Sequence, residues 1–282
     1  MTLPLPVVRG FVRATLRPLL GPPVPLGVQR RVLQALSTPS PLKAGTTSTP
    51  VVLGGRSALR LTAGPTWDGA VLWAHGGAFV TGSPVQDRAF ASHLAAACGA
   101  AVYLPDYRLA PEHTGAEQVA DLQAALADLT EGRVVVGGDS AGGTLALLVA
   151  QDPARPLAGI ALVSPLVDLS LATSGAWTGS DIVVRRDWAE LGVRAAFGDD
   201  RPDLLTADLS GLPAAVVHVS EHERLRPEGE ALAHRIGAEL VVLDGLWHVA
   251  HLHCGLLRES EVATARLGGS VRALLDRGTA AP

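Results

Sequence analysis

The sequence predicts an α/β fold, with a mostly parallel sheet covered on both faces by helices. Short apolar segments of strand length alternate along the chain with segments in which small and apolar residues recur at helical spacing. The chain has 282 residues, 48% of them hydrophobic, and can therefore bury a large core. No repeat and no linker divides that core, so we expect one main domain.

The first fifty residues are rich in proline and carry two helical segments, near 7–16 and 27–36. The first segment places arginines at a spacing of four, at Arg9, Arg13 and Arg17, with apolar residues largely elsewhere on the helix. Such a helix can lie on a membrane surface, or it can cover a protein core with its cations in solvent. We expect the second arrangement, because prolines cut the helix short and one or two turns bind lipid weakly.

A hairpin is expected next, because residues 51–53 and 58–62 are strand-like and the glycines at 54–55 suit a tight turn. The strands expected after it are 70–75, 100–105, 133–137, 158–163, 214–220 and 240–243. The helices expected among them are 85–98, 116–129, 141–151, 228–237 and 260–276. In the second of these helices Ala and Leu recur at helical spacing, and Asp121 and Asp128 are expected to point outward.

Residues 137–143 read GGDSAGG and connect a strand-like segment, 133–136, to a helix. The central GDSAG matches G-x-S-x-G, the pattern of a nucleophile elbow, in which a serine sits on a strained strand-to-helix turn. Glycines relieve the crowding of such a turn, and the N-terminus of the following helix favours developing negative charge. Ser140 is therefore the candidate nucleophile, and the alternative is a glycine-rich turn with an incidental serine.

A second motif, HGGAF at residues 75–79, directly follows a short apolar strand. A glycine-rich loop can point backbone N–H groups at the oxyanion of a tetrahedral intermediate, as the HGGG loop of lipases does. The candidate donors are the N–H groups of Gly77, Ala78 and Ala141, with Gly76 as a further candidate. Ala78 stands where the usual pattern has glycine. Its N–H can still donate if its φ stays negative, and its methyl group is expected to narrow the acyl site.

These two motifs, with DYRLAPEH at 106–113, resemble the hormone-sensitive-lipase-like family of α/β-hydrolase esterases. The similarity continues through DLSGLP at 208–213 and covers about residues 50–275. The resemblance implies hydrolysis of carboxylic esters by a serine, acid and histidine triad, with neither a metal nor an organic cofactor. It also implies a helical cap, formed by residues 1–50 and an insertion near 166–205, over a catalytic domain at 51–282.

The α/β-hydrolase order of serine, acid and histidine places the base after Ser140. Six histidines follow Ser140, at positions 218, 222, 234, 248, 251 and 253. His248 is favoured, because it follows a strand-like segment and a turn, which is the layout of the family. His251 is the main alternative. His218 is expected to face the packing of the sheet, and His234 falls on a predicted helix.

The acid departs from the family pattern. The family has aspartate in a stretch like DPLRDEG, and the matching residues 223–229 read ERLRPEG. Glu223 takes the aspartate position, where it would accept the Nδ1–H of His248 and stabilise the imidazolium. Glutamate is chemically competent for this role, since α/β-hydrolases use either carboxylate. Glu221 is the second candidate, and Asp244 is a weaker one.

Residues 248–254 read HVAHLHC and hold four side chains of types that bind zinc. A structural zinc site usually joins two segments, and no partner pair such as C-x-x-C exists in the chain, so no metal site is expected. Val249 and Ala250 stand where the family commonly has Gly-Phe, and this change reshapes the acyl pocket. The charged side chains of residues 106–113 are expected to brace the oxyanion loop rather than to act in catalysis.

Composition excludes several other classes of protein. The net charge of −4, with scattered basic residues, gives no nucleic-acid-binding surface. No apolar stretch approaches the ~20 residues that span a bilayer, and arginines and prolines interrupt any secretory signal. The two cysteines, Cys98 and Cys254, form no disulfide framework, so we expect reduced thiols in a cytoplasmic protein.

The sequence thus predicts hydrolysis of small or medium carboxylic esters through an acyl-enzyme, without a cofactor. One alternative is a ligand-binding relative that keeps the pocket and has lost turnover, motivated by the departures at Ala78, Glu223 and Val249. An amidase or formamidase with the same groups is another alternative. The oligomeric state stays open, with a homodimer as one alternative.

Overall fold

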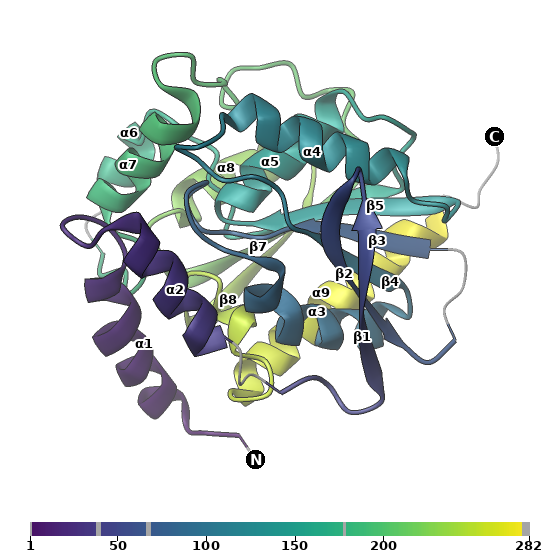
Figure 1. Cartoon of the computed structure of the whole chain (residues 1–282), viewed down its shortest axis with the longest axis horizontal. Helices are drawn as coiled ribbons and strands as arrows, with labels where there is room; N and C mark the ends of the chain where they lie inside the picture. Colours follow the sequence, from purple (N-terminus) through teal and green to yellow (C-terminus); the bar gives the residue numbers. More distant parts are fainter. Residues whose placement is uncertain (1, 38–40, 66–68, 177–178, 278–282) are drawn as a thin grey trace.

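The computed structural model describes residues 2–37, 41–65, 69–176 and 179–277 of the chain. These residues form one eight-stranded sheet with helices on both faces (Figure 1). The strands are β1 (Thr46–Leu53), β2 (Arg56–Ala63), β3 (Gly69–Ala74), β4 (Ala101–Pro105), β5 (Arg133–Asp139), β6 (Gly159–Val163), β7 (Ala215–His222) and β8 (Glu239–Trp247). Their spatial order is β1-β2-β4-β3-β5-β6-β7-β8. Strand β2 pairs antiparallel with β1 and β4, and the pairs from β4 to β8 are parallel, so the predicted fold class is confirmed.

Two layers of helices cover the sheet (Figure 1). On one face lie α3 (Pro84–Cys98) and α9 (Arg258–Arg277), and on the other lie α4 (Gly115–Ala127), α5 (Ala141–Gln151) and α8 (Arg226–Ile236). Successive residues of a strand point to opposite faces. In β3, Leu72 packs into the core on the α4 and α5 side, whereas Val71 and Trp73 pack on the α3 and α9 side. This burial on both faces is typical of parallel sheets and explains the continuous apolar runs in the sequence.

Four described helices lie outside these layers and are called the outer helices below. They are α1 (Leu5–Leu19), α2 (Leu26–Ser37), α6 (Ala172–Ala176) and α7 (Arg186–Phe197). Figure 1 shows them together at one side of the molecule, although they come from two distant parts of the chain. Hydrogen bonds join the two parts: Arg17 donates to the carbonyl oxygen of Asp181, and Arg185 donates to that of Pro22 at 2.9 Å. The described parts of the N-terminal segment and of the segment near 166–205 are therefore in direct contact.

The predicted hairpin is present, and its strands are longer than expected. Gly54 and Gly55 join β1 to β2 with φ values of 58° and 74°, which are left-handed values that suit a tight turn. Strand β1 begins at Thr46 rather than near residue 51, and β8 continues to Trp247. Residues 46–49 of β1 are polar, so the hydrophobic pattern does not predict a strand there. They form one because they pair antiparallel with β2.

The prediction that Asp121 points into solvent is wrong. Asp121 is 9% exposed, whereas Asp128 is exposed as expected. The carboxylate of Asp121 accepts hydrogen bonds from the backbone and side chain of Arg108, and Arg56 lies 3.4 Å away. Arginines from two other segments therefore pair with this carboxylate and allow it to be buried.

Among the described residues, no helix is both long and apolar enough to cross a membrane. Cys98 and Cys254 are free, buried thiols. Burial raises their pKa values to about 11 and about 12, so both stay protonated and poorly nucleophilic near neutral pH.

Candidate active site

Four segments that carry the candidate residues meet at one edge of the sheet. The loop at residues 75–82 follows β3, Ser140 follows β5, Glu223 follows β7 and His248 follows β8. These strands run parallel to one another, so their carboxyl ends lie at the same edge. Open α/β sheets bind their ligands at this edge.

Ser140 sits in strained geometry where β5 turns into α5. Its φ is 51° and its ψ is −121°, a region that L-residues rarely adopt. The turn is crowded, because a Cβ on Gly138 would overlap the carbonyl oxygen of Gly142, and a Cβ on Gly142 would overlap that of Ala74. Glycine is therefore required on both sides of the serine, as the motif predicts. Ser140 is 8% exposed and lines a pocket.

The His248 ring and the Glu223 carboxylate form a buried pair. Nδ1 of His248 lies 2.9 Å from Oε2 of Glu223, and the two side chains are 4% and 0% exposed. The other carboxylate oxygen of Glu223 accepts the backbone N–H of Ser220 at 2.7 Å. Burial lowers the pKa of His248, but the hydrogen bond and charge of Glu223 outweigh it, and the pKa is raised above 6.5. One ring nitrogen is thus fixed, and Nε2 remains to act in the pocket that His248 lines.

The alternative acids and bases lie elsewhere. Glu221 is exposed and accepts the backbone N–H of Gly245, in strand β8, at 2.7 Å, and Asp244 is also exposed. His251 is buried against His218, with 3.2 Å between ring nitrogens, and burial lowers its pKa to about 3. His218 itself is packed in the sheet, as expected. None of these four residues is among those that line the described pocket at Ser140.

The loop after β3 departs from both expectations for Ala78, although its backbone N–H is present at any φ and stays a candidate donor. Ala78 has a φ of 51°, not a negative one, and the next residue, Phe79, has a φ of 65°. The methyl group of Ala78 does not line the described pocket but lies against α7, where a Cβ on Gly192 would stand 2.8 Å from it. The residue that constrains Ala78 belongs to a helix far away in the sequence, so the motif alone could not reveal it.

Gly76 is held by the residue that precedes Ser140. Its backbone N–H acts as a hydrogen-bond donor to the Asp139 carboxylate and lowers the pKa of that group, while burial raises it more strongly. A Cβ on Gly76 would overlap Oδ2 of Asp139, so only glycine fits here. Because Asp139 engages the N–H of Gly76, Gly77, Ala78 and Ala141 are the stronger candidates for oxyanion donors, and Gly76 stays the further candidate.

Residues 106–113 brace the loop after β3, but they do so through Tyr107 and the backbone rather than through the charged side chains expected from the sequence. The Tyr107 hydroxyl donates to the carbonyl oxygen of His75 at 2.6 Å, at the start of the loop. The backbone N–H of Ala110 donates to the carbonyl oxygen of Phe79 at 2.9 Å, further along it. These bonds fix a loop whose left-handed residues would otherwise favour other conformations.

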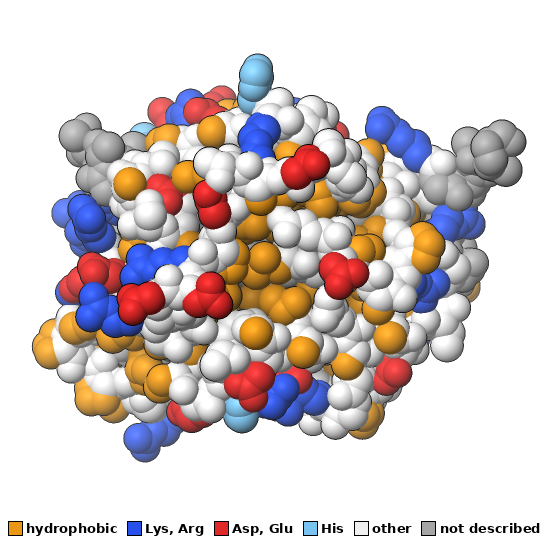
Figure 2. Space-filling view, turned by 90° about the horizontal axis from the view of Figure 1, so that it is seen from above, with side chains coloured by type: hydrophobic (Ala, Val, Ile, Leu, Met, Phe, Trp, Pro, Cys, Tyr) orange, Lys and Arg blue, Asp and Glu red, His pale blue; other side chains and the backbone are white. Residues whose placement is uncertain are grey.

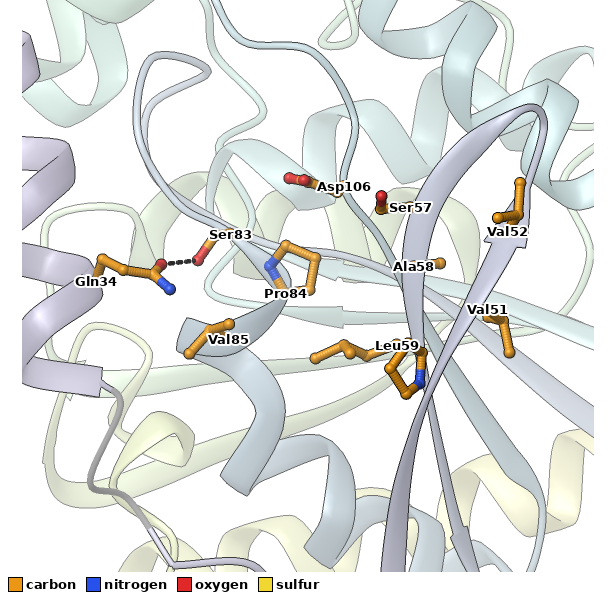
Figure 3. Close-up of a pocket in the computed structure, with 11 residues that line it drawn as sticks. Gln34, Val51, Val52, Ser57, Ala58, Leu59, Ser83, Pro84, Val85 and Asp106 are labelled. Carbon is orange, nitrogen blue, oxygen red and sulfur yellow. Dashed lines mark hydrogen bonds between the residues drawn. The ribbon is translucent and has the colours of Figure 1, made fainter.

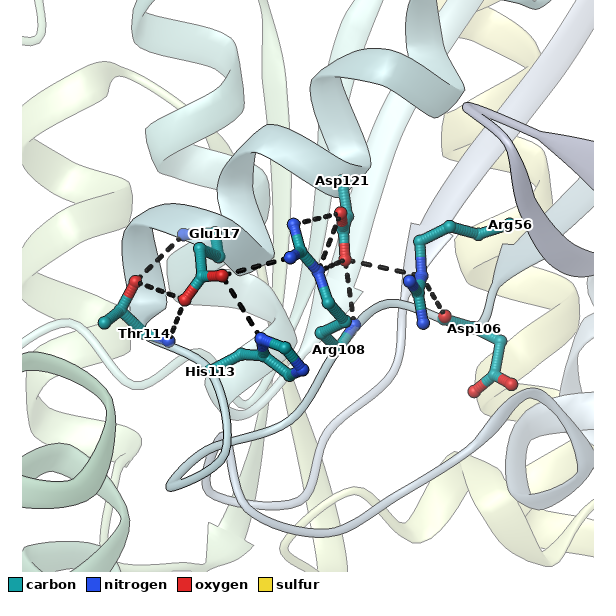
Figure 4. Close-up of polar contacts among 7 residues, drawn as sticks. All are labelled: Arg56, Asp106, Arg108, His113, Thr114, Glu117 and Asp121. Carbon is teal, nitrogen blue, oxygen red and sulfur yellow. Dashed lines mark hydrogen bonds and ion pairs between the residues drawn. The ribbon is translucent and has the colours of Figure 1, made fainter.

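The charged residues of this run contact α4 rather than the pocket. Figure 4 shows Arg108 between Asp121 and Glu117. Nη2 of Arg108 lies 2.8 Å from Oδ1 of Asp121, and Nη1 lies 3.0 Å from Oε1 of Glu117. His113 lies 3.2 Å from Glu117, and the carbonyl oxygen of Asp106 accepts a hydrogen bond from Arg56. The network holds residues 106–113 on the surface of α4.

Arg30 links the outer helix α2 to the same region. Its guanidinium donates to the carbonyl oxygens of Val80 and Ala110, each at 2.8 Å, and pairs with both oxygens of Glu112. The hydrogen bond from Arg30 lowers the pKa of Glu112 to about 2, so the pair stays ionised in any mildly acidic solution. An outer helix is therefore tied to the end of the loop that carries Gly77 and Ala78.

The pocket at Ser140 is small and largely apolar, with a volume of about 60 Å³. The sheet edge contributes Ser140, His248 and Val249 to its lining. Residues 1–50 and 166–205 contribute Leu16, Leu20, Leu33, Val183 and Trp188. The outer segments thus form a wall of the pocket.

Sequence reasoning gave no place in this pocket to five polar or aromatic residues that line it: Thr81, Gln86, Asp139, Trp188 and His253. Nε2 of His253 accepts the indole N–H of Trp247 at 3.2 Å, and burial lowers its pKa to about 4. Asp139 occupies the variable position of G-x-S-x-G, and its place beside Ser140 was the one signal available for it. Trp188 lies in a segment that carries no motif.

Larger hollows lie away from Ser140. A cavity of about 500 Å³ lies between β1, β2 and the start of α3, where Ser83 donates to Gln34 at 2.8 Å (Figure 3). Another, of about 740 Å³, lies between α4, α5 and the end of α7. Figure 2 looks down on the α4 and α5 side and shows an apolar hollow with acidic side chains near its rim. Neither cavity contains a nucleophile beside a base, and no group of three or more described His, Cys, Asp or Glu residues could hold a metal ion.

Comparisons with known proteins identify the family of the chain. Residues 71–252 match a family model described as the alpha/beta hydrolase fold. The chain is 30% identical to the putative acetyl-hydrolase LipR of Mycobacterium tuberculosis over 238 residues, which are 76% of each protein. It is 32% identical to an acetyl-hydrolase of Streptomyces hygroscopicus over 229 residues, 74% of this chain and 77% of that relative.

Solved structures give the same result over nearly the whole chain. An esterase from the bacterial hormone-sensitive lipase family is 29% identical, with a TM-score of 0.84 over 98% of this chain and 100% of that one. A mutant of the esterase E40 is 28% identical, with a TM-score of 0.88 over 96% of this chain and 98% of that one.

Proposed function

The chain belongs to the α/β-hydrolase family, among the hormone-sensitive-lipase-like esterases, and we propose that Ser140, Glu223 and His248 are its catalytic triad. The observation that carries this proposal is the buried 2.9 Å contact between His248 and Glu223, made at the pocket that Ser140 lines. Three residues from three strand ends supply a nucleophile, a base and an anion that orients the base.

The mechanism follows from the protonation of the imidazole. Glu223 accepts the Nδ1–H of neutral His248, which leaves Nε2 unprotonated and able to take the proton of Ser140 Oγ. The serine oxygen attacks the ester carbonyl, and the charge of Glu223 stabilises the imidazolium that forms. His248 then protonates the leaving alcohol. Water, activated by the same nitrogen, hydrolyses the acyl-enzyme.

Backbone N–H groups of Gly77, Ala78 and Ala141 are the proposed donors to the oxyanion. Ala141 is the first residue of α5, where N–H groups have no partner within the helix and the helix dipole favours negative charge. We propose Gly76 as a support of the loop rather than as a donor, since Asp139 takes its N–H. Preorganised donors of this kind are each worth ~10²–10³ in kcat.

Short acyl esters are the proposed substrates, and the outer helices are the proposed cap over the site. Ligand pockets for drug-sized molecules have volumes of ~300–1,000 Å³, far above the volume at Ser140. The apolar wall from Leu16, Leu20 and Trp188 suits an acyl chain of very few carbons. Two of the similar relatives are named acetyl-hydrolases, which supports the same preference.

The experiment that tests the triad compares Ser140→Ala with Ser210→Ala, a serine on an exposed turn far from the pocket. We expect hydrolysis of p-nitrophenyl acetate, and labelling by a fluorophosphonate, to be lost in Ser140→Ala and kept in Ser210→Ala. Labelling of the unaltered protein also separates an active hydrolase from a relative that only binds ligands. Undiminished turnover by Ser140→Ala would show that another nucleophile acts.

A further inference from the structure

Two carboxyl groups, those of Asp87 and Asp139, face each other beneath the proposed site. Asp87 lies in the first turn of α3, and Asp139 is the last residue of β5, directly before Ser140. They are 0% and 2% exposed, and their carboxyl groups are within hydrogen-bonding reach of each other. Neither residue is used by the mechanism above.

The hydrogen-bond donors around the pair are unevenly shared. Oδ1 of Asp139 accepts the indole N–H of Trp73 at 3.1 Å, and Oδ2 lies against Gly76. Among the residues that the structure describes, none makes a well-aligned hydrogen bond to either oxygen of Asp87. A buried carboxylate with no donor is very unfavourable, whereas a buried carboxylic acid can itself donate to a neighbouring anion.

Within the described part of the chain, the ionisable groups next to the pair do not supply a charge that could balance two anions. Tyr107 faces both carboxyl groups, and burial together with their charges raises its pKa well above its usual range, so it stays neutral. Burial lowers the pKa of His75 to about 4, and those of His251 and His253, on the 3-10 helix packed against α3, to about 3 and about 4. Arg88, next to Asp87 in α3, does not make a well-aligned bond to it.

His248 is the basic group that lies close enough to lower the pKa of Asp139. During turnover it becomes a full cation when it takes the serine proton. Two carboxylates that share one buried site cannot both be ionised, and burial with the nearby charge of Asp139 raises the pKa of Asp87 well above its usual range. The pair can therefore hold one proton and one negative charge.

We propose that Asp87 is a neutral carboxylic acid whose O–H donates to the Asp139 carboxylate, and that this singly charged pair positions the oxyanion loop and the imidazolium of His248. The negative charge stays on Asp139, where it receives the N–H groups of Trp73 and Gly76. The pair therefore anchors the start of the glycine loop from below. It also adds a fixed anion near His248, on a different strand from Glu223.

Both residues are positioning residues, and the proposal rests on the function proposed for Ser140. The first test does not depend on turnover. Infrared difference spectra of the whole protein in D₂O at neutral pH should show the C=O stretch of a protonated carboxylic acid that is absent from Asp87→Asn. Glu228→Gln is the matched control, because Glu228 is also buried, with a pKa raised to about 8, and should remove a separate band. No loss of intensity in Asp87→Asn would mean that Asp87 is ionised, and would overturn the proposal.

The second test separates the hydrogen bond from simple packing. Asp87→Asn keeps a neutral donor to Asp139 and should retain kcat for p-nitrophenyl acetate within a few-fold. Asp87→Leu has similar size but no donor, and kcat should fall by up to ~10²-fold, the effect of a misplaced catalytic loop. Equal activity of the two variants would contradict a positioning role.

The third test addresses the charge and remains valid if Asp87→Leu does not fold. Asp139→Asn removes the anion, so the pKa of His248 should fall and the acidic limb of the kcat/KM profile should move to lower pH. An unmoved limb would refute the effect on His248. Turnover by Ser140→Ala would refute the function proposed for Ser140. It would leave the protonation of Asp87 untouched, because the infrared band is measured on the protein without substrate.

Discussion

Gly192 of α7 lies directly against Ala78 of the oxyanion loop. A Cβ on Gly192 would stand 2.8 Å from the methyl carbon of Ala78 and would overlap the Ala78 carbonyl oxygen. The loop therefore accepts alanine at position 78 because α7 presents a residue without a side chain there. An outer helix and the proposed oxyanion loop are in backbone contact.

Gly192→Ala should impair both stability and turnover. The new methyl group meets backbone atoms that cannot rotate away, so we expect a loss of about 1–3 kcal/mol in the free energy of unfolding. Displacement of the loop should also lower kcat by up to ~10²-fold. Thermal unfolding and steady-state kinetics measure the two effects. Gly211→Ala is the control, because a Cβ there meets nothing within 4 Å, and comparable losses in both variants would contradict the contact argument.

Glu223→Gln should preserve the shape of the site but remove the anion at Nδ1 of His248. We expect kcat to fall by about 10³–10⁴, because the amide no longer selects the active tautomer or stabilises the imidazolium. Glu223 raises the pKa of His248, so its loss should lower that pKa and move the acidic limb of kcat/KM to lower pH. Hydrolysis of p-nitrophenyl acetate, measured as a function of pH, gives both kcat and the position of the acidic limb. Glu221→Gln, at an exposed position, should leave kcat and the acidic limb unchanged. If Glu221→Gln lowers kcat and shifts the limb while Glu223→Gln does neither, Glu221 is the acid.

Val249→Gly should widen the range of accepted acyl chains. Val249 lines the pocket with a φ of 50°, a strained value for a β-branched residue, and its N–H donates to Ser164 Oγ at 3.2 Å. Removing the side chain opens space beside His248 and relieves the strain. The ratio of kcat/KM for p-nitrophenyl butyrate to that for the acetate should rise about tenfold, the usual scale for a pocket that gains room for methylenes. Val249→Ala should give an intermediate ratio, and a constant ratio across the three proteins would show that this side chain does not limit the acyl group.

Arg30→Met should weaken the tie between α2 and the oxyanion loop. It leaves the carbonyl oxygens of Val80 and Ala110 without their side-chain donor, at a cost of about 1–3 kcal/mol for each that becomes unsatisfied. We expect a lower melting temperature and about a tenfold lower kcat/KM. Arg31→Met is the matched control, since the Arg31 guanidinium bonds to Gly27 within its own helix and is exposed. A wild-type melting temperature for Arg30→Met would exclude this tie as a source of stability.

The sequence was sufficient where chemistry is encoded in short segments. The elbow at Ser140 and the glycines around it follow from the steric demands of one turn, and the sheet follows from apolar runs of strand length. Glu223 and His248 could be paired in advance because the resemblance to the hormone-sensitive-lipase-like family implies an acid and a histidine at these two positions. Their catalytic roles remain predictions, although the structure brings their side chains into contact.

The remaining features depend on partners that no local pattern specifies. Asp121 was expected in solvent, because a helical pattern cannot show that Arg108 lies opposite it. Ala78 packs against Gly192, and Asp87 is buried beside Asp139. Each pair joins residues from different elements, so a three-dimensional arrangement was needed to find it.

The wall that closes over Ser140 is made by residues such as Leu16 and Trp188, whereas the reacting groups stand on strand ends. Most of the wall and the reacting groups therefore lie on separate parts of the polypeptide. We expect substitutions of wall residues such as Leu16 and Trp188 to change which esters enter, whereas Gly192 of the same α7 must be kept because it supports the oxyanion loop.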